Sequence, residues 1–167
     1  MVKSIPVFKE KVRHVGTFDF KETYRLLFEW LIGKGYVVDE PSYKEVIGTG
    51  GVKEVEVRWK AKKNLTDYFQ SEFGIFFHPL GMSSVEVEVN GVKQKMNKGD
   101  LTIELNCSLN LDHKNKFEED SFTKTLRNFY DLYLVRNRIE KQEAKVVSDF
   151  EEMVAQLKEI LILTGIR

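Results

Sequence analysis

Apolar and polar residues alternate without a break from Leu101 to Leu111, with an apolar residue at every odd position. Successive side chains of a β-strand point to opposite faces, so this pattern predicts one long strand with one face in the core and one in water. Strands that are covered on one face only are typical of antiparallel sheets. Shorter alternating runs over Val55–Ala61 and Val85–Val89 predict further strands of the same kind.

Clusters of glycine, asparagine and serine divide the region from Tyr36 to Asp112 into about five strands. The predicted turns lie at Gly48–Gly51, Gly81–Ser84, Asn90–Gly91 and Asn97–Asp100. These residue types favour turns because they tolerate left-handed backbone angles or hydrogen-bond to nearby backbone. A first strand is predicted over Ile5–Val15, which gives a meander-like antiparallel sheet of about five to six strands.

Two other stretches show the helical period. In the first, apolar residues recur at spacings of 4, 3 and 4, at Phe20, Tyr24, Leu27 and Leu31. This spacing places them on one face of an amphipathic helix. Asp19 precedes the stretch as a predicted N-cap, with Glu22 completing a capping box. Gly33 and Gly35 are expected to end the helix.

The second helical stretch, Ser121–Thr164, contains neither glycine nor proline. It fits either two helices that meet near Arg136–Asn137 or one rod of about 60 Å at 1.5 Å per residue. We favour the pair, because it fits a compact domain better. The predicted fold class is therefore α+β, with the N-terminal and C-terminal helices packed on the dry face of the sheet. We expect residues 1–167 to form a single domain.

Two apolar segments exceed what one amphipathic face needs. The aromatic run Phe69–Phe77 breaks the alternation near Phe76, which a bulge, a buried central strand or an exposed apolar edge would each explain. The tail Leu157–Ile166 is apolar on more than one helix face, so part of it must lie against a second surface, either the sheet or another subunit. The candidate interaction residues are Phe69, Phe73, Phe76, Phe77, Leu161, Ile162 and Ile166.

Charge and cysteine content narrow the classes of partner. The chain carries 26 Lys and Arg against 26 Asp and Glu, which removes the long-range attraction that drives non-specific binding to nucleic acid. No apolar stretch is long enough to span a membrane. The lone Cys107 cannot form an internal disulfide and falls on the apolar side of its strand, so we interpret it as a core residue of a cytoplasmic protein.

Candidate chemistry is concentrated in Glu54-Val55-Glu56-Val57-Arg58, which resembles the Glu-x-Glu-x-Lys motif of the triphosphate tunnel family. The resemblance implies Glu54 and Glu56 as ligands of a divalent metal and Arg58 as a phosphate contact, with Glu86 and Glu88 as supplements. Alternating glutamate and valine is equally typical of any half-exposed strand. His14, His78 and His113 are far apart in the sequence and have no partner at metal-ligand spacing.

Two functions from different classes follow. We favour a non-catalytic protein-interaction or assembly module that self-associates or binds another protein, with no cofactor. The alternative is a metal-dependent enzyme that binds a polyphosphate or nucleotide through its Glu-x-Glu-x-Arg strand. Separately, the segments 36–47, 55–69, 85–91 and 126–138 resemble uncharacterised archaeal proteins with no assigned function. That resemblance implies a prokaryotic, disulfide-free setting.

Overall fold

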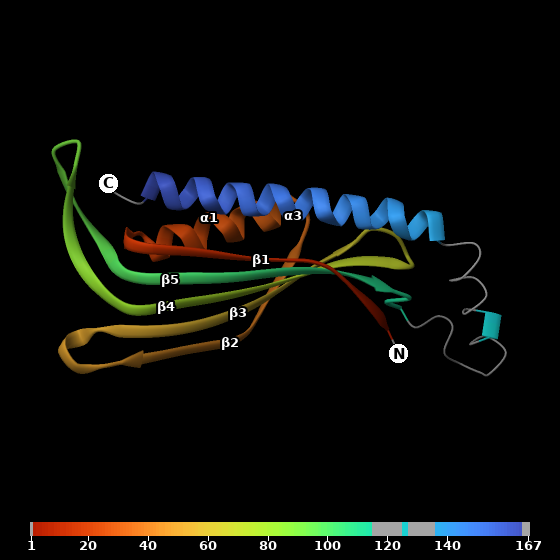
Figure 1. Ribbon diagram of the computed structural model, residues 1–167, viewed down its shortest axis with the longest axis horizontal. Coiled ribbons are helices and arrows are strands. Elements are labelled where there is room, and N and C mark those ends of the chain that lie inside the picture. The colour runs from red at the N-terminus through yellow and green to blue at the C-terminus, as the bar shows by residue number, and fades with distance from the viewer. Residues whose placement is uncertain (1, 115–124, 127–135, 165–167) are drawn as a thin grey trace.

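The computed structural model describes residues 2–114, 125–126 and 136–164. Within these ranges, a five-stranded antiparallel sheet carries two helices on one face, which confirms the α+β class (Figure 1). The strands are β1 (Lys3–Phe18), β2 (Val37–Ile47), β3 (Lys53–Asn64), β4 (Phe69–Val89) and β5 (Val92–Leu111). The helices are α1 (Phe20–Gly33), between β1 and β2, and α3 (Arg136–Thr164), after β5. A short 3₁₀ helix, η1 (Thr49–Gly51), forms the tip of the β2–β3 hairpin.

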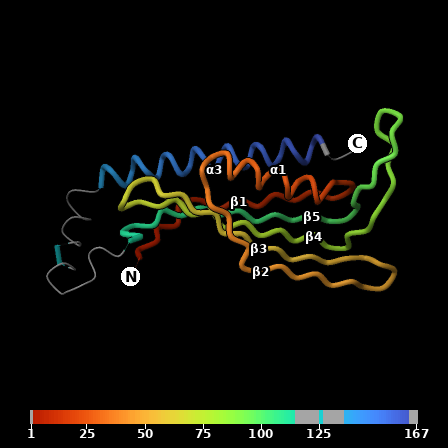
Figure 2. Tube along the Cα trace, turned by 180° about the vertical axis from the view of Figure 1, so that it is seen from behind, coloured from red at the N-terminus to blue at the C-terminus, as the bar shows by residue number. Residues whose placement is uncertain are grey.

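The strand order is β1-β5-β4-β3-β2. Strands β2 to β5 follow one another as the predicted meander, whereas β1 pairs antiparallel with β5, from Lys3 opposite Leu111 to Phe18 opposite Asn97. Since β1 and β2 are the two edges, α1 connects opposite sides of the sheet along the face that it covers (Figure 2). The sheet is therefore open in the described part of the chain, and the closed tunnel that the family resemblance implied does not form there.

Two of the predicted turns are wrong. Gly81–Ser84 and Asn97–Asp100 lie inside β4 and β5, and the turn at residues 65–68, between β3 and β4, was not predicted. The region after Tyr36 therefore holds four strands rather than five. Leu80 is opposite Asp100 but Ser83 is opposite Lys98, so β4 carries one extra residue here as a β-bulge. Gly81 takes a positive φ of 60° in this bulge. The hairpin bends at the bulge, and its tip rises beside the C-terminal end of α3 (Figure 1).

Gly99, which lies opposite the bulge, is needed for a different reason. A Cβ built on Gly99 would lie 2.8 Å from the backbone carbonyl oxygen of Leu80. Only a residue without a side chain therefore allows β5 to approach the bulged strand so closely. The segments that contain Gly81 and Gly99 therefore mark a bend in a continuing hairpin rather than the ends of strands.

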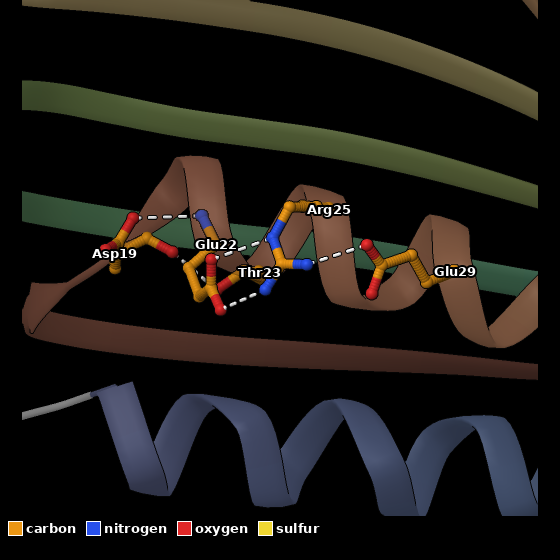
Figure 3. A network of polar contacts seen from close by, with 5 residues as sticks. All are labelled: Asp19, Glu22, Thr23, Arg25 and Glu29. Carbon is orange, nitrogen blue, oxygen red and sulfur yellow. Dashed lines mark hydrogen bonds and ion pairs between the residues drawn. The ribbon is translucent and has the colours of Figure 1, made fainter.

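The start of α1 follows the prediction in part. The Asp19 carboxylate accepts a hydrogen bond from the backbone N–H of Glu22 at 2.9 Å, which satisfies one of the free donors at the helix start. The side chain of Glu22 does not complete a capping box, because it binds Arg25 at 2.6 Å (Figure 3). Arg25 also reaches Glu29 at 2.7 Å, and these charge-assisted hydrogen bonds raise the pKa of the Arg25 guanidinium. They also lower the pKa of the Glu22 carboxyl. The helix ends at Gly33, followed by Gly35 with a φ of 85°.

The core lies between the helices and one face of the sheet. Helix α3 contributes a buried stripe at the predicted helical spacing: Val146, Phe150, Met153, Leu157 and Leu161. Helix α3 is described from Arg136 onward, and the residues directly before it lie outside the described residues, so the choice between two helices and one rod stays a prediction. Most of 121–135, the first part of the second predicted helical stretch, lies outside the described residues. None of the helices in the described ranges is long and apolar enough to span a membrane.

The predicted interaction residues have diverse positions. Phe69, Phe73 and Phe77 are buried in the core, because β4 is the central strand of the sheet. Phe76 is half-buried on the opposite face, so the alternation continues through the aromatic run without a bulge there. Leu161 is buried in the stripe of α3. Ile162 is exposed, and Ile166 lies outside the described residues.

Candidate ligand site on the open face of the sheet

The face of the sheet that the helices leave uncovered, called the open face below, is polar. Its side chains are those that alternate with the core residues along each strand. Near the middle of the sheet they are Lys9, Lys11, Glu54, Glu56, Arg58, Lys60, Glu72, Phe76, His78, Glu104 and Asn106. The sequence motif Glu54-x-Glu56-x-Arg58 therefore lies on this face.

A hollow of about 270 Å³ lies at the centre of the open face. Its floor includes Gly74 of β4, which is paired with Lys60 on one side and with Asn106 on the other. A Cβ on Gly74 would lie 2.7 Å from Oδ1 of Asn106, so the missing side chain lets the Asn106 amide lie across β4. A glycine inside a central strand leaves room for a close approach by another group.

Three cationic side chains border this hollow: Lys9 from β1, and Arg58 and Lys60 from β3. Within the described residues, none of them forms an ion pair. The two carboxylates at the rim already have cationic partners, since Glu72 lies 3.6 Å from Lys62 and Glu104 lies 3.9 Å from Lys11. The hollow therefore has an excess of positive charge, which favours an anionic ligand.

The orientation of Arg58 is set by an aromatic ring. Its guanidinium carbon lies 4.0 Å from the centroid of the Phe76 ring on β4. A cation–π contact of this kind uses the face of the guanidinium and leaves its N–H groups for other acceptors. Phe76 in turn stacks on His78, with centroids 5.4 Å apart and planes 29° apart. Arg58, Phe76 and His78 therefore form a continuous line along the open face.

At the far end of this line, His78 meets both glutamates of the motif. Its Nε2 atom lies 3.0 Å from Glu54 Oε1 and 3.9 Å from Glu56 Oε1. Between Val57–Phe77 and Lys53–Met82, β4 has one residue more than β3, which is the same bulge seen against β5. The regular pairing of β3 with β4 ends at Val57–Phe77, directly before His78, whereas the extra residue of β4 lies between Leu80 and Ser83. The three side chains are the one group of potential metal ligands found in the described residues.

A polar cluster formed by Glu40 of β2, Trp59 of β3 and Tyr24 of α1 supports the edge of the hollow. Glu40 accepts hydrogen bonds from Trp59 Nε1 at 2.8 Å and from the hydroxyl of Tyr24. Burial, together with the hydrogen bond to Glu40, raises the pKa of Tyr24 to about 12. The cluster fixes the irregular stretch of β2 between Asp39 and Ser42, where Pro41 lines the hollow.

The remaining candidates from the sequence lie elsewhere. Glu86 and Glu88 are on the arm of the β4–β5 hairpin, opposite Lys95 and Lys93, and do not join the site. His14 and His113 each donate a hydrogen bond from Nε2 to a backbone carbonyl oxygen, that of Thr17 and that of Thr66 respectively. Cys107 is buried among the core residues, and this burial raises the pKa of its thiol to about 11.

Sequence reasoning missed four residues of the open-face site. Lys9, Lys60 and Gly74 were not singled out, and His78 was set aside because its partners are distant in the sequence. A signal was present, since His78 follows Phe76 by two positions and so shares its face. The register of β3 against β4 was needed to place it beside Glu54.

No protein-family model, curated protein or solved structure matches the chain. The resemblances to archaeal proteins and to the triphosphate tunnel motif therefore stay predictions. The function has to be inferred from the open face itself.

Proposed function

We propose that this protein is a non-catalytic binding module whose open face takes a small ligand bearing phosphate groups. The observation that carries the proposal is the convergence of Lys9, Arg58 and Lys60, without carboxylate partners in the described structure, on one hollow. Charged side chains are normally paired or fully solvated, and a concave surface with an excess of one sign attracts the opposite charge.

The chemistry of the side chains favours phosphate over a simple carboxylate. Arg58 offers a planar fork of N–H donors, which binds two oxygens of a phosphate at once. Lys9 and Lys60 add point charges on either side of the hollow, and the Asn106 amide adds a neutral donor. Three cations match a ligand with several negative charges, such as a polyphosphate or the phosphate chain of a nucleotide.

The size of the hollow limits the ligand. Its volume of about 270 Å³ is slightly below the range of most ligand pockets, which span roughly 300–1,000 Å³. The ligand is therefore small, or it places only its phosphate groups in the hollow and extends over the open face.

The burial of four predicted interaction residues favours ligand binding over self-association. Four of the predicted interaction residues, Phe69, Phe73, Phe77 and Leu161, are buried in the core of the chain itself. Their apolar character is accounted for by folding, so it no longer requires a second subunit. The polar residues of the open face have no such role in the core.

The direct test is thermal unfolding of the protein with inorganic tripolyphosphate as the probe, in EDTA and at constant ionic strength. A ligand that binds only the folded state stabilises it, by about 2.7 kcal/mol at 100 times its Kd. We expect a saturable rise in Tm for the wild type and a much smaller one for Lys60→Gln. Lys95→Gln is the matched control, because it removes the same charge from the exposed hairpin.

The proposal is rejected if tripolyphosphate gives no saturable shift. It is also rejected if Lys95→Gln reduces the shift as much as Lys60→Gln, since that result would reflect net charge rather than a site. EDTA keeps this test independent of any metal.

Self-association is a second candidate, favoured by one specific observation. Ile162 and Leu163, at the end of α3, are 67% and 75% exposed. Exposed apolar residues at adjacent positions are typical of contact surfaces. Light scattering over a hundredfold range of concentration tests this candidate: Ile162→Glu would lower the mass of an oligomer without unfolding the protein. A monomer at all concentrations would exclude it.

A further inference from the structure

We propose that Glu54, Glu56 and His78 form a binding site for a divalent transition-metal ion on the open face. Each residue offers one ligand atom, and these atoms all lie within 4.8 Å of one another. Metal bonds to nitrogen and carboxylate oxygen are about 2.0–2.2 Å long, so ligand atoms on one ion are roughly 3–3.5 Å apart. Small rotations of the glutamate side chains bring the three atoms to that spacing.

The site combines residues from two strands. Glu54 and Glu56 are two positions apart on β3, and therefore share a face, while His78 comes from β4, directly after the Val57–Phe77 pair. The Nε2 atom of His78 already points toward both carboxylates, at 3.0 and 3.9 Å. An arrangement of this kind is more than a pair of acidic residues, since the imidazole and both carboxylates converge on one point.

The ring of His78 is held in place by its neighbour. It stacks on Phe76, which is itself covered by Arg58, so the ring has an apolar support on one side. The His78 side chain is 25% exposed, against 47% and 38% for Glu54 and Glu56. The imidazole is therefore the more fixed ligand, and the two carboxylates are the more mobile ones that close on the ion.

The ligand types indicate the class of metal. Imidazole nitrogen suits Zn²⁺, Fe²⁺, Co²⁺, Ni²⁺ and Cu²⁺, whereas Mg²⁺ and Ca²⁺ prefer sites made of oxygen alone. Three protein ligands leave at least one position of a four-coordinate ion open. We therefore expect Zn²⁺ to bind far better than Mg²⁺, with its open position directed away from the sheet.

One cation of the neighbouring strand lies next to Glu56 in the sheet. Lys44 of β2 is paired in register with Glu56 of β3, so its ammonium group is within reach of this edge of the site. In the structure Lys44 forms no ion pair with Glu56 at 4.0 Å or less among the described residues, and the Glu56 carboxylate is directed toward His78 instead. A metal ion replaces the His78–Glu54 hydrogen bond rather than an established lysine pair.

The proposed metal site requires only its three ligands and does not depend on the hollow bordered by Lys9, Arg58 and Lys60. The two are nevertheless neighbours, since Arg58 borders the hollow and connects to His78 through Phe76. An ion held by the three side chains would add positive charge beside the hollow. Binding of the two ligands would then be mutually favourable, and reciprocal by linkage.

The test is calorimetric titration of tag-free, metal-stripped protein with ZnCl₂ in a buffer without phosphate. We expect one Zn²⁺ per chain for the wild type. We expect at least a tenfold loss of affinity in His78→Gln and in Glu56→Gln, since even residues that only support metal ligands change affinity by about 10–100-fold. Glu88→Gln is the matched control, because Glu88 is an exposed strand glutamate outside the site, and it should bind Zn²⁺ as the wild type does. Circular dichroism of each variant confirms that it is folded.

Three results would overturn the inference. They are the absence of stoichiometric Zn²⁺ binding, equal affinity in folded His78→Gln and wild type, and a loss of affinity in Glu88→Gln as large as in Glu56→Gln. Equal binding of Mg²⁺ and Zn²⁺ would contradict the role of the imidazole. Because no phosphate is present, these outcomes are independent of the tripolyphosphate test.

Discussion

The guanidinium of Arg58 lies over the ring of Phe76, 4.0 Å from its centroid, although the two residues belong to different strands. Arg58 and Phe76 are direct partners in the antiparallel register of β3 and β4. Cross-strand partners on one face lie about 4.5–5.5 Å apart at Cβ, so the pair is a direct result of strand register. It places a cation beside the hollow and explains why an aromatic residue occurs on the open face.

The two adjacent phenylalanines of β4 should differ sharply in their contribution to stability. Phe77 is fully buried and packs against Trp59, with ring centroids 4.8 Å apart. We expect Phe77→Ala to lower the free energy of unfolding by about 3–5 kcal/mol. Phe76→Ala should cost less than about half of that, because Phe76 is only half-buried. Urea unfolding measures both values, and equal losses would contradict the assignment of the two faces.

Gly74→Ala should impair the ligand site more than the fold. The added Cβ meets only the end of the exposed Asn106 side chain, which can move away. The φ angle of Gly74 is not positive, so alanine can adopt the same backbone conformation. We expect the substitution to change the free energy of unfolding by about 1 kcal/mol or less. The displaced amide and the new methyl group should weaken tripolyphosphate binding. Retention of full binding in a folded variant would show that the floor of the hollow is not part of the site.

Asp19→Ala tests the cap of α1. The substitution removes the acceptor of the Glu22 N–H, and losing an N-cap costs about 0.5–2 kcal/mol. Glu29→Ala is the control on the same helix, since Glu29 forms an exposed ion pair with Arg25, which contributes little to stability. Denaturant unfolding of both variants should give the larger loss for Asp19→Ala.

The thiol of Cys107 should resist alkylation in the folded protein. Burial raises its pKa to about 11, so the reactive thiolate is scarce at pH 8.5. In the unfolded chain the pKa returns to about 8.5, which gives roughly a hundredfold more thiolate. Because the folded pKa is the higher one, stability from this group is present at lower pH and decreases as pH rises above about 8.5.

Mass spectrometry after iodoacetamide treatment, with and without denaturant, checks this prediction. Slow labelling without denaturant and fast labelling with it are expected. Equally fast labelling under both conditions would show that Cys107 is not a core residue.

The parts of the fold that depend on local sequence were predictable. The alternation over Leu101–Leu111 identified the core face of β5, and Asp19 identified the start of α1, because period and capping are properties of short segments. The glycines at 81 and 99 were misread as turns. A bulge and a turn use the same residue types, and only the pairing of β4 with β5 distinguishes them.

The rest depends on contacts between distant segments. Nothing in the sequence of β1 specifies that it pairs with β5. Lys9 reaches the hollow only through this pairing, so its place in the site could not be predicted from the sequence. The motif Glu54-x-Glu56-x-Arg58 was recognised, but His78 is brought to it by the register of β3 against β4. Glu54, Glu56 and Arg58 could therefore be identified from the motif, whereas Lys9 and His78 could be assigned to the site only from the strand pairing.

The most direct test of the central claim, that the open face is a ligand site, is a titration of ¹⁵N-labelled protein with tripolyphosphate in EDTA, followed by NMR. The claim predicts saturable shifts of the amides around the hollow, above all those of Gly74, Asn106 and Lys60, with the core amides of α3 unchanged. Shifts confined to the β4–β5 hairpin or to α3, or no saturable shifts at all, would contradict it.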